Sequence, residues 1–169
     1  MRRRSPFGKP DDGSWRTTLA WLLALALLAA LPSCGIGLRT RALLGGKIDF
    51  KVLVSDTANQ NSPVALDFLL VYNSDLLKEL AKMPARDWFD KRDQIKRDYA
   101  DDTGLEVWQW EWVPGQNVPL QRLPLKPKAK GGVIFANYLS PGEHRARIDP
   151  HESLMITLLE KSFTVRPLP

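Results

Sequence analysis

The segment KIDFKVLVSDTANQNSPVALDFLLVY, residues 47–72, holds two apolar stretches separated by a polar one. In residues 47–54 apolar side chains alternate with others, which is the period of a half-buried strand. Residues 63–72 are mostly apolar, share one apolar face at the same period and predict a second strand. Residues 55–62 are turn formers apart from Ala58, so we expect a polar loop between the strands.

After the second strand the apolar spacing changes from two residues to that of a helix. Asn73 or Ser74 is a suitable cap for a helix over residues 74–83, which has a stripe of leucines. Residues 85–100 combine apolar and charged positions in the pattern of a second amphipathic helix. The sequence therefore predicts a helical insertion over about 74–100.

Turn residues then separate a series of short strands. We expect strands at residues 105–113, 118–125, 133–139, 143–149, 153–159 and 162–166. The second of these should be an edge strand, because Pro119 and Pro124 cannot donate to a ladder. About eight short strands with frequent turns indicate a mainly β fold, a β-sandwich over residues 47–169, with the helices on one end or face.

The first residues have the order of an export signal. Five basic residues precede an apolar run over residues 19–31 that contains no charge, and Leu31-Pro32-Ser33-Cys34 follows. A basic region, an apolar region and a small residue before the cleavage point are typical of a signal peptide. The run of 13 residues is shorter than the roughly 20 that a membrane-spanning helix needs. Residues 1–33 are therefore predicted to be a cleaved signal peptide.

The end of this segment resembles the bacterial lipobox, with Leu31 at position −3 and Ser33 at −1 from Cys34. That resemblance implies cleavage before Cys34, lipidation of its thiol and acylation of the new amino terminus. Several acyl chains hold a protein stably on a membrane, whereas one chain binds marginally. The residue after the cysteine is Gly35 and not Asp. In lipoproteins of this kind, that implies a location at the periplasmic face of the outer membrane. Residues 34–46 are then a lipidated flexible tether.

The charge and the cysteine content of the sequence limit the classes of function and the cross-links that are possible. The chain has 24 basic and 19 acidic residues, of which 5 and 2 precede Cys34, so the mature part is close to neutral. That balance argues against a nucleic-acid surface. Cys34 is the only cysteine, so the domain cannot rely on a disulfide.

Patterns of catalysis and metal binding are not evident. His144 and His151 are the only histidines, and they are too few and too far from other ligands to indicate a zinc site. The sequence contains no G-x-S-x-G elbow and no phosphate-binding glycine loop. We therefore expect no enzyme, no metal, no small-molecule substrate and no cofactor other than the covalent lipid.

Trp108, Trp110 and Trp112 fall on one face of the predicted strand 105–113. Aromatic side chains commonly fill sandwich cores, and the opposite face of this strand is more polar, so core packing is the favoured interpretation. The alternative is a ligand face for cell-wall sugars.

Lys126, Lys128 and Lys130 alternate with small residues in a predicted loop. A solvated loop is the default interpretation, and contact with anionic headgroups or a cell-wall acid is the alternative.

The order of lipobox, glycine-containing tether, strand, polar loop and apolar strand resembles the TssJ-type outer-membrane lipoproteins of type VI secretion systems. The resemblance rests on Asn59-Gln60-Asn61-Ser62-Pro63 before Val64-Ala65-Leu66, and on residues 131–148. It implies a transthyretin-like two-sheet β-sandwich with a small added helical part. The segment 85–112 is longer than the usual insertion of that family.

The resemblance also implies a function. Such a lipoprotein binds the periplasmic C-terminal part of an inner-membrane TssM-type protein and so tethers a trans-envelope complex to the outer membrane. The implied contact residues are Thr57, Ala58, Asn59, Gln60, Asn61 and Ser62. A cell-wall or carbohydrate-binding lipoprotein and a secretion pilotin remain alternative hypotheses.

Overall fold

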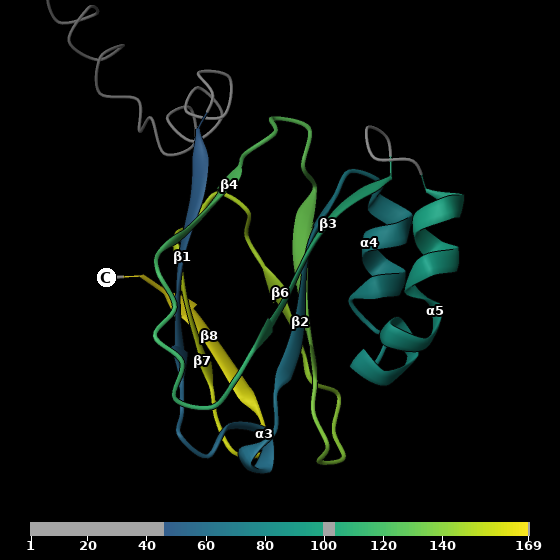
Figure 1. Cartoon of the computed structure of the whole chain (residues 1–169). Coiled ribbons are helices and arrows are strands. Elements are labelled where there is room, and N and C mark those ends of the chain that lie inside the picture. The colour runs from purple at the N-terminus through teal and green to yellow at the C-terminus, as the bar shows by residue number, and fades with distance from the viewer. Residues whose placement is uncertain (1–45, 100–103, 169) are drawn as a thin grey trace, which may run out of the picture. The chain divides into compact units, whose positions relative to one another are not determined.

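The computed structural model describes residues 46–99 and 104–168. The predicted signal peptide, Cys34 and the tether lie outside these residues. The strands are β1 Lys47–Val54, β2 Val64–Val71, β3 Leu105–Trp112, β4 Gln121–Pro124, β5 Gly131–Asn137, β6 Arg145–Ile148, β7 Leu154–Leu158 and β8 Phe163–Pro167. The helical segments are α3 Ala58–Asn61, α4 Ser74–Leu80 and α5 Ala85–Asp98 (Figure 1).

The strands form two four-stranded sheets that face each other (Figure 1). One sheet has the order β4-β1-β7-β8 and the other β3-β2-β5-β6. β1 and β7 are parallel, and the other paired strands are antiparallel. The predicted mainly β sandwich with two helices after the second strand is confirmed, and β4 lies at a sheet edge as expected.

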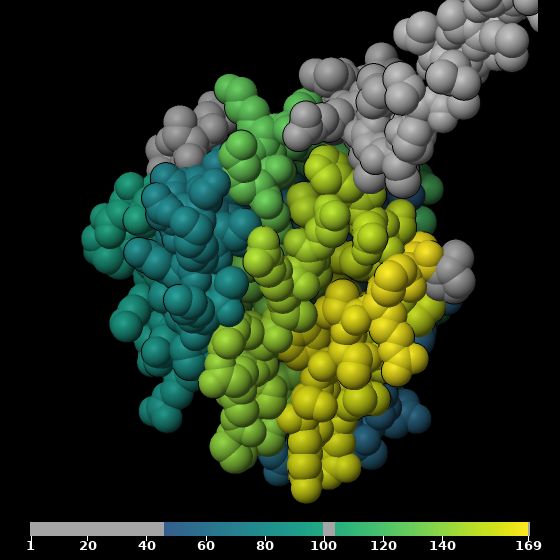
Figure 2. Space-filling model, turned by 180° about the vertical axis from the view of Figure 1, so that it is seen from behind, coloured from purple at the N-terminus to yellow at the C-terminus, as the bar shows by residue number. Residues whose placement is uncertain are grey.

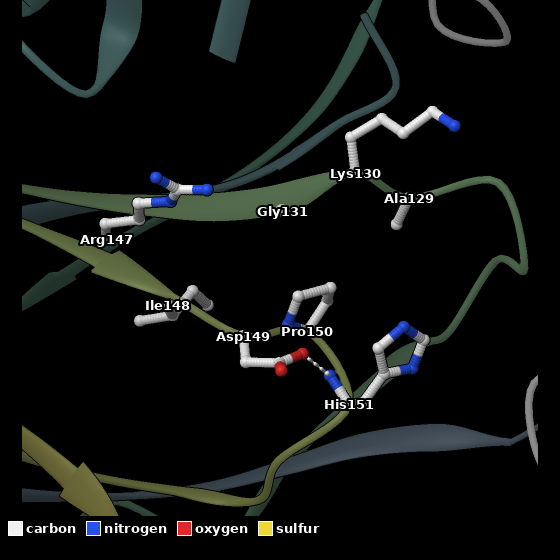
Figure 3. Close-up of a pocket in the computed structure, with 8 residues that line it drawn as sticks. All are labelled: Ala129, Lys130, Gly131, Arg147, Ile148, Asp149, Pro150 and His151. Carbon is white, nitrogen blue, oxygen red and sulfur yellow. Dashed lines mark hydrogen bonds between the residues drawn. The ribbon is translucent and has the colours of Figure 1, made fainter. Parts of the chain in front are cut away.

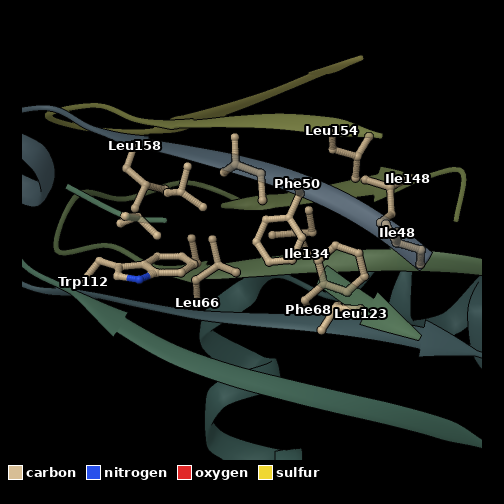
Figure 4. Packing of buried hydrophobic residues seen from close by; sticks show 14 of the residues in the cluster. Ile48, Phe50, Leu66, Phe68, Trp112, Leu123, Ile134, Ile148, Leu154 and Leu158 are labelled. Atoms are coloured by element: carbon tan, nitrogen blue, oxygen red, sulfur yellow. The ribbon is translucent and has the colours of Figure 1, made fainter. Parts of the chain in front are cut away.

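The main core fills the space between the sheets, because alternate residues of each inner strand point into it. Phe50 of β1 and Phe68 of β2 are completely buried, and their rings stack with centroids 5.3 Å apart. Figure 4 shows them packed beside Ile134 and Leu66. Full burial of a side chain of this size contributes roughly 1.5–3 kcal/mol, so this layer is a major source of stability.

A second, smaller core lies between the outer face of β2 and β5 and the two helices. Trp88 of α5 is completely buried and stacks on Phe135 of β5 at 5.1 Å between ring centroids. Helices cover one face of β2 and the opposite sheet covers the other, so nearly all of its side chains are buried. Asn73 caps α4 as predicted, through bonds from the N–H groups of Asp75 and Leu76.

The only charged residue that is buried among the described residues is Asp67, in the centre of β2. Its Oδ2 accepts hydrogen bonds from Trp88 Nε1 at 2.9 Å and from Gln109 Nε2 at 3.1 Å, and Arg92 lies at 3.2 Å. A buried carboxylate needs such partners. Asp67 therefore fixes α5 to the sheet.

The sandwich has two distinct ends. We name the tether end after the point where the chain enters β1. Among the described residues it comprises 46–47, 71–73, 104–106, 122–131, 147–154 and 166–168. The loop end comprises the turns at residues 55–62, 113–116, 138–144 and 159–162, at the other end of the strands (Figure 1). β1 has eight residues at about 3.3 Å each, so the two ends are roughly 26 Å apart.

Among residues 46–99 and 104–168, no helix is long and apolar enough to cross a membrane.

Candidate protein interface at the loop end

The 55–62 loop contains a backbone conformation that the sequence did not predict. Asn59, Gln60 and Asn61 all have left-handed backbones, with φ angles of 48°, 56° and 63°. L-residues with a side chain incur roughly 1–2 kcal/mol each in this conformation, and asparagine tolerates it better than most. Three consecutive cases in one turn require other interactions to hold them.

Asn59 provides much of that support. Its side-chain Nδ2 donates to the carbonyl of Pro63 at 2.8 Å, and its Oδ1 accepts from the N–H of Leu139 at 2.7 Å. The backbone N–H groups of Asn59 and Gln60 donate to the carbonyls of Leu159 and Glu160, each at 3.1 Å. The turn is therefore attached to both sheets.

The turn presents only some of its residues to solvent. Ala58 and Asn59 are buried, at 0% and 3% exposed, so their side chains do not form the outer surface. Thr57, Gln60 and Asn61 are exposed, and Ser62 is half-buried. Of the six residues predicted to contact a partner, Ala58 and Asn59 thus support the turn. The other four form its surface: Thr57, Gln60, Asn61 and Ser62.

Exposed apolar side chains surround this polar turn. Val113 is 52% exposed, Leu139 67% and Leu159 39%. They follow the ends of β3, β5 and β7, and sequence reasoning missed them because single apolar residues in turns carry no periodic signal. In Figure 2 the yellow-green 138–144 turn and the yellow 159–162 turn lie side by side at the lower end. Ser140 Oγ joins these two turns by donating to the Lys161 carbonyl at 2.7 Å.

A groove of about 830 Å³ continues from this surface toward α5. It lies between the amino-terminal turn of α5 and the 138–144 turn, and Leu139 belongs to both surfaces. Charged side chains of both signs line it, including Arg86, Asp90 and Glu143. An apolar centre with a polar, charged rim is the usual composition of a protein-binding surface.

Tyr138 and His144 form the floor beside Leu139. Their rings stack at 4.8 Å between centroids, and Tyr138 is 8% exposed. Burial raises the pKa of Tyr138 from the ordinary value of 10.0 to about 12, so the hydroxyl ionises only at more alkaline pH than an exposed tyrosine. His144 has a left-handed backbone, with φ of 43°, and its Nε2 lies 2.8 Å from the Ser140 carbonyl.

The same groups do not form a catalytic centre. Ser140 Oγ lies 3.5 Å from His144 Nε2, but this hydroxyl donates to the Lys161 carbonyl. A serine nucleophile needs a base that takes its proton and a third group that orients the base. His151 lies at the opposite end of the sandwich. The described part of the chain contains no group of three side chains that could hold a metal ion.

The three tryptophans predicted as core or as a ligand face point toward the space between the sheets. Trp112 is 4% exposed and belongs to the main core, while Trp108 and Trp110 pack against it from the edge strand β3. Trp110 contacts Phe50 edge-on at 5.5 Å and stacks with Trp112 at 5.6 Å. Trp108 and Trp110 remain half-buried, so the core packing is complete only for Trp112.

No protein-family model and no curated protein matches this sequence. The described sandwich is nevertheless found in solved lipoproteins of type VI secretion systems. The T6SS lipoprotein TssJ1 of Pseudomonas aeruginosa superposes with a TM-score of 0.55 at 14% identity, over 74% of this chain and 98% of that chain. Serratia marcescens Lip, a membrane-bound component of the type VI secretion system, gives 0.53 at 15% identity, over 73% and 97%.

A chain in a structure of the T6SS protein TssM C-terminal domain from EAEC also matches. Its TM-score is 0.51 at 14% identity, over 72% of this chain and 97% of that chain. The fold of this protein is therefore the TssJ-type β-sandwich, at low sequence identity, as the resemblance implied.

Proposed function

We propose that this protein is a lipoprotein of a type VI secretion membrane complex, anchored in the outer membrane by lipid on Cys34. Its loop end binds the periplasmic part of an inner-membrane TssM-type protein. The observation that carries the proposal is the exposed turn in which Asn59, Gln60 and Asn61 are all left-handed. Backbone strain of this kind concentrates at binding and catalytic sites, and this turn has no catalytic group.

The composition of the loop end suits a protein partner. Polar side chains of Gln60 and Asn61 stand beside the exposed apolar side chains of Leu139 and Leu159. Apolar contacts supply affinity on desolvation, and hydrogen bonds from a rigid polar turn supply specificity. Because the turn is fixed by bonds to both sheets, little conformational entropy is lost when a partner binds it.

The position of this surface agrees with a tethering role. The chain enters the sandwich at the tether end, 13 residues after Cys34, and the loop end lies roughly 26 Å beyond it along β1. A lipid on Cys34 attaches the chain on the side of the tether end, so the loop end stays accessible to a partner that extends from the inner membrane. The similarity to T6SS lipoproteins supports this assignment through the fold.

The experiment that tests the proposal is affinity purification of the lipidated protein from cross-linked cells, followed by mass spectrometry. We expect recovery of a large inner-membrane protein with a periplasmic C-terminal domain. Recovery of murein fragments alone would support the cell-wall hypothesis instead, and recovery of a secretin would support the pilotin hypothesis. Either of these results contradicts the proposed function.

A further inference from the structure

The tether end carries a basic loop between β4 and β5. Residues 125–130 contain Lys126, Lys128 and Lys130 and no acidic residue. Lys128 and Lys130 are exposed, and neither forms an ion pair with any other residue that the structure describes. In Figure 2 this green loop projects at the upper end of the sandwich.

The base of the loop is fixed, so its tip has a defined direction. Lys126 is paired with Glu106 of β3, and the hydroxyl of Tyr72 donates to the same carboxylate at 2.7 Å. The N–H of Lys130 donates to the carbonyl of Val71 at 2.8 Å. These contacts hold both ends of the loop against the second sheet, and the Lys128 side chain lies between them at the tip.

A recess of about 390 Å³ lies between this loop and the β6–β7 connection. Lys130 and Arg147 stand on its rim, and His151 closes one side (Figure 3). The His151 Nδ1 is buried and has no hydrogen-bond partner among the described residues. Asp149 is the acidic residue of the recess, and its Oδ1 accepts from the backbone N–H of His151 at 2.9 Å.

Exposed positive charge thus gathers on two neighbouring connections at the tether end. Among the described residues 125–130 and 147–152, exposed Lys128, Lys130 and Arg147 outnumber the exposed acids Asp149 and Glu152. The loop end has no comparable basic group, because Lys161 adjoins the exposed Glu160 and Asp56 is also exposed there.

We propose that the tether end docks on an anionic lipid surface, with headgroup phosphates against Lys128, Lys130 and Arg147. This inference rests on the proposed lipid on Cys34, which lies 13 residues before Lys47. Thirteen residues reach at most about 45 Å, so a lipid anchor confines the tether end close to the headgroups. Each lysine near an anionic surface strengthens association roughly five-fold.

Docking in this manner has a consequence for function. A lipid attachment 13 residues before β1 does not by itself fix the direction of the sandwich, whereas contact at the tether end aligns β1 away from the membrane. The loop end is then held roughly 26 Å from the surface and faces the periplasm. The basic loop therefore orients the partner-binding turn before the partner arrives.

The test is chemical labelling of lysines on the lipidated protein reconstituted in vesicles. One set of vesicles is phosphatidylcholine alone, and the other also contains phosphatidylglycerol. We expect an amine reagent, read by mass spectrometry, to label Lys128 and Lys130 several-fold less on the anionic vesicles. Labelling should recover when salt is raised from about 0.1 M to about 1 M, which shortens the Debye length from roughly 10 Å to 3 Å. Lys161 at the loop end and Lys91 on α5 are the controls, and their labelling should not change.

Equal labelling of Lys128 and Lys130 on both kinds of vesicle overturns the proposal. Loss of anchoring is detected separately, because an anchored protein floats with phosphatidylcholine vesicles as well as anionic ones. A second measurement uses protein without an anchor and scores its flotation with anionic vesicles only. The double variant Lys128→Glu/Lys130→Glu should weaken the association of this protein with the vesicles by about 30-fold or more. The matched variant Lys91→Glu/Lys96→Glu on α5 should float like the unaltered protein, and an equal loss in both variants also overturns the proposal.

Discussion

The side-chain Oδ1 of Asn59 accepts a hydrogen bond of 2.7 Å from the backbone N–H of Leu139, which lies 80 residues later in the chain. The same side chain donates through Nδ2 to the Pro63 carbonyl. One buried amide therefore joins the left-handed turn to the end of β5 and fixes the turn beside an exposed leucine. The surface that we assign to partner binding depends on this contact.

Asn59→Ala should lower the free energy of unfolding by about 1–3 kcal/mol, because it leaves the Leu139 N–H and the Pro63 carbonyl without their partner. Gln60→Ala is the matched control, since Gln60 has the same left-handed backbone but an exposed side chain. Urea denaturation of both variants gives the comparison. Equal midpoints for the two variants would show that the Asn59 bonds do not hold the turn.

Asp67→Ala should destabilise the protein by about 2–4 kcal/mol, because it removes the acceptor for the Trp88 indole and for Arg92. Asp93→Ala, on the exposed side of α5, should change stability by less than about 0.5 kcal/mol. Chemical denaturation followed by tryptophan fluorescence reports both. A wild-type midpoint for the Asp67 variant would mean that apolar packing alone holds α5 on the sheet.

Two neighbouring glycines of β5 should respond differently to alanine. A Cβ at Gly132 would lie 2.8 Å from the Leu69 carbonyl oxygen and 2.7 Å from Ile148, so Gly132→Ala forces backbone to move. We expect a loss of about 1–3 kcal/mol. A Cβ at Gly131 meets only the flexible end of Leu77, so Gly131→Ala should cost less than about 1 kcal/mol. Thermal unfolding of the pair tests this order, and its reversal contradicts the packing described here.

Tyr138 should make the protein sensitive to alkaline pH. In the unfolded chain a tyrosine ionises with a pKa near 10, whereas burial raises the pKa of Tyr138 in the fold to about 12. The unfolded state therefore loses its proton first, so the free energy of unfolding decreases as the pH rises from about 10 to about 12. Denaturation curves at several pH values should show this decrease relative to Tyr138→Phe, with no relative change below that window. Parallel curves for the two proteins would contradict it.

Cys34→Ser should abolish lipidation and release the protein from the membrane fraction. Metabolic labelling with a clickable fatty acid, followed by fractionation, measures both effects. Ser33→Ala retains a small residue before the cysteine and is the control that should remain labelled. Labelling that persists in the Cys34 variant would show that the lipid is attached elsewhere.

Much of this fold can be predicted from local sequence pattern. The period-two alternation in β1 gives its observed bounds, and the Asn73 cap gives the start of α4. The ends of α4 and α5 fall two or three residues before the predicted ends, because terminal helical turns are weakly held.

The candidate site was less accessible to sequence reasoning. The polar character of residues 55–62 identifies a loop, but the left-handed turn depends on bonds to residues 139 and 159, which are distant in sequence. For the same reason, the family resemblance implies partner contact for all six residues 57–62, although the side chains of Ala58 and Asn59 are buried. The shared position of the exposed Leu139 and Leu159 at the loop end follows from the topology alone, since each residue lies just beyond the end of a different strand.

The most direct test of the partner-binding surface is photo-cross-linking in cells from a photoreactive amino acid placed at Gln60. Gln94, which is exposed on α5, is the matched control position. We expect a cross-link from position 60 to a TssM-type inner-membrane protein and none from position 94. A cross-link to that protein from position 94 but not from position 60 would contradict the assignment of the loop end.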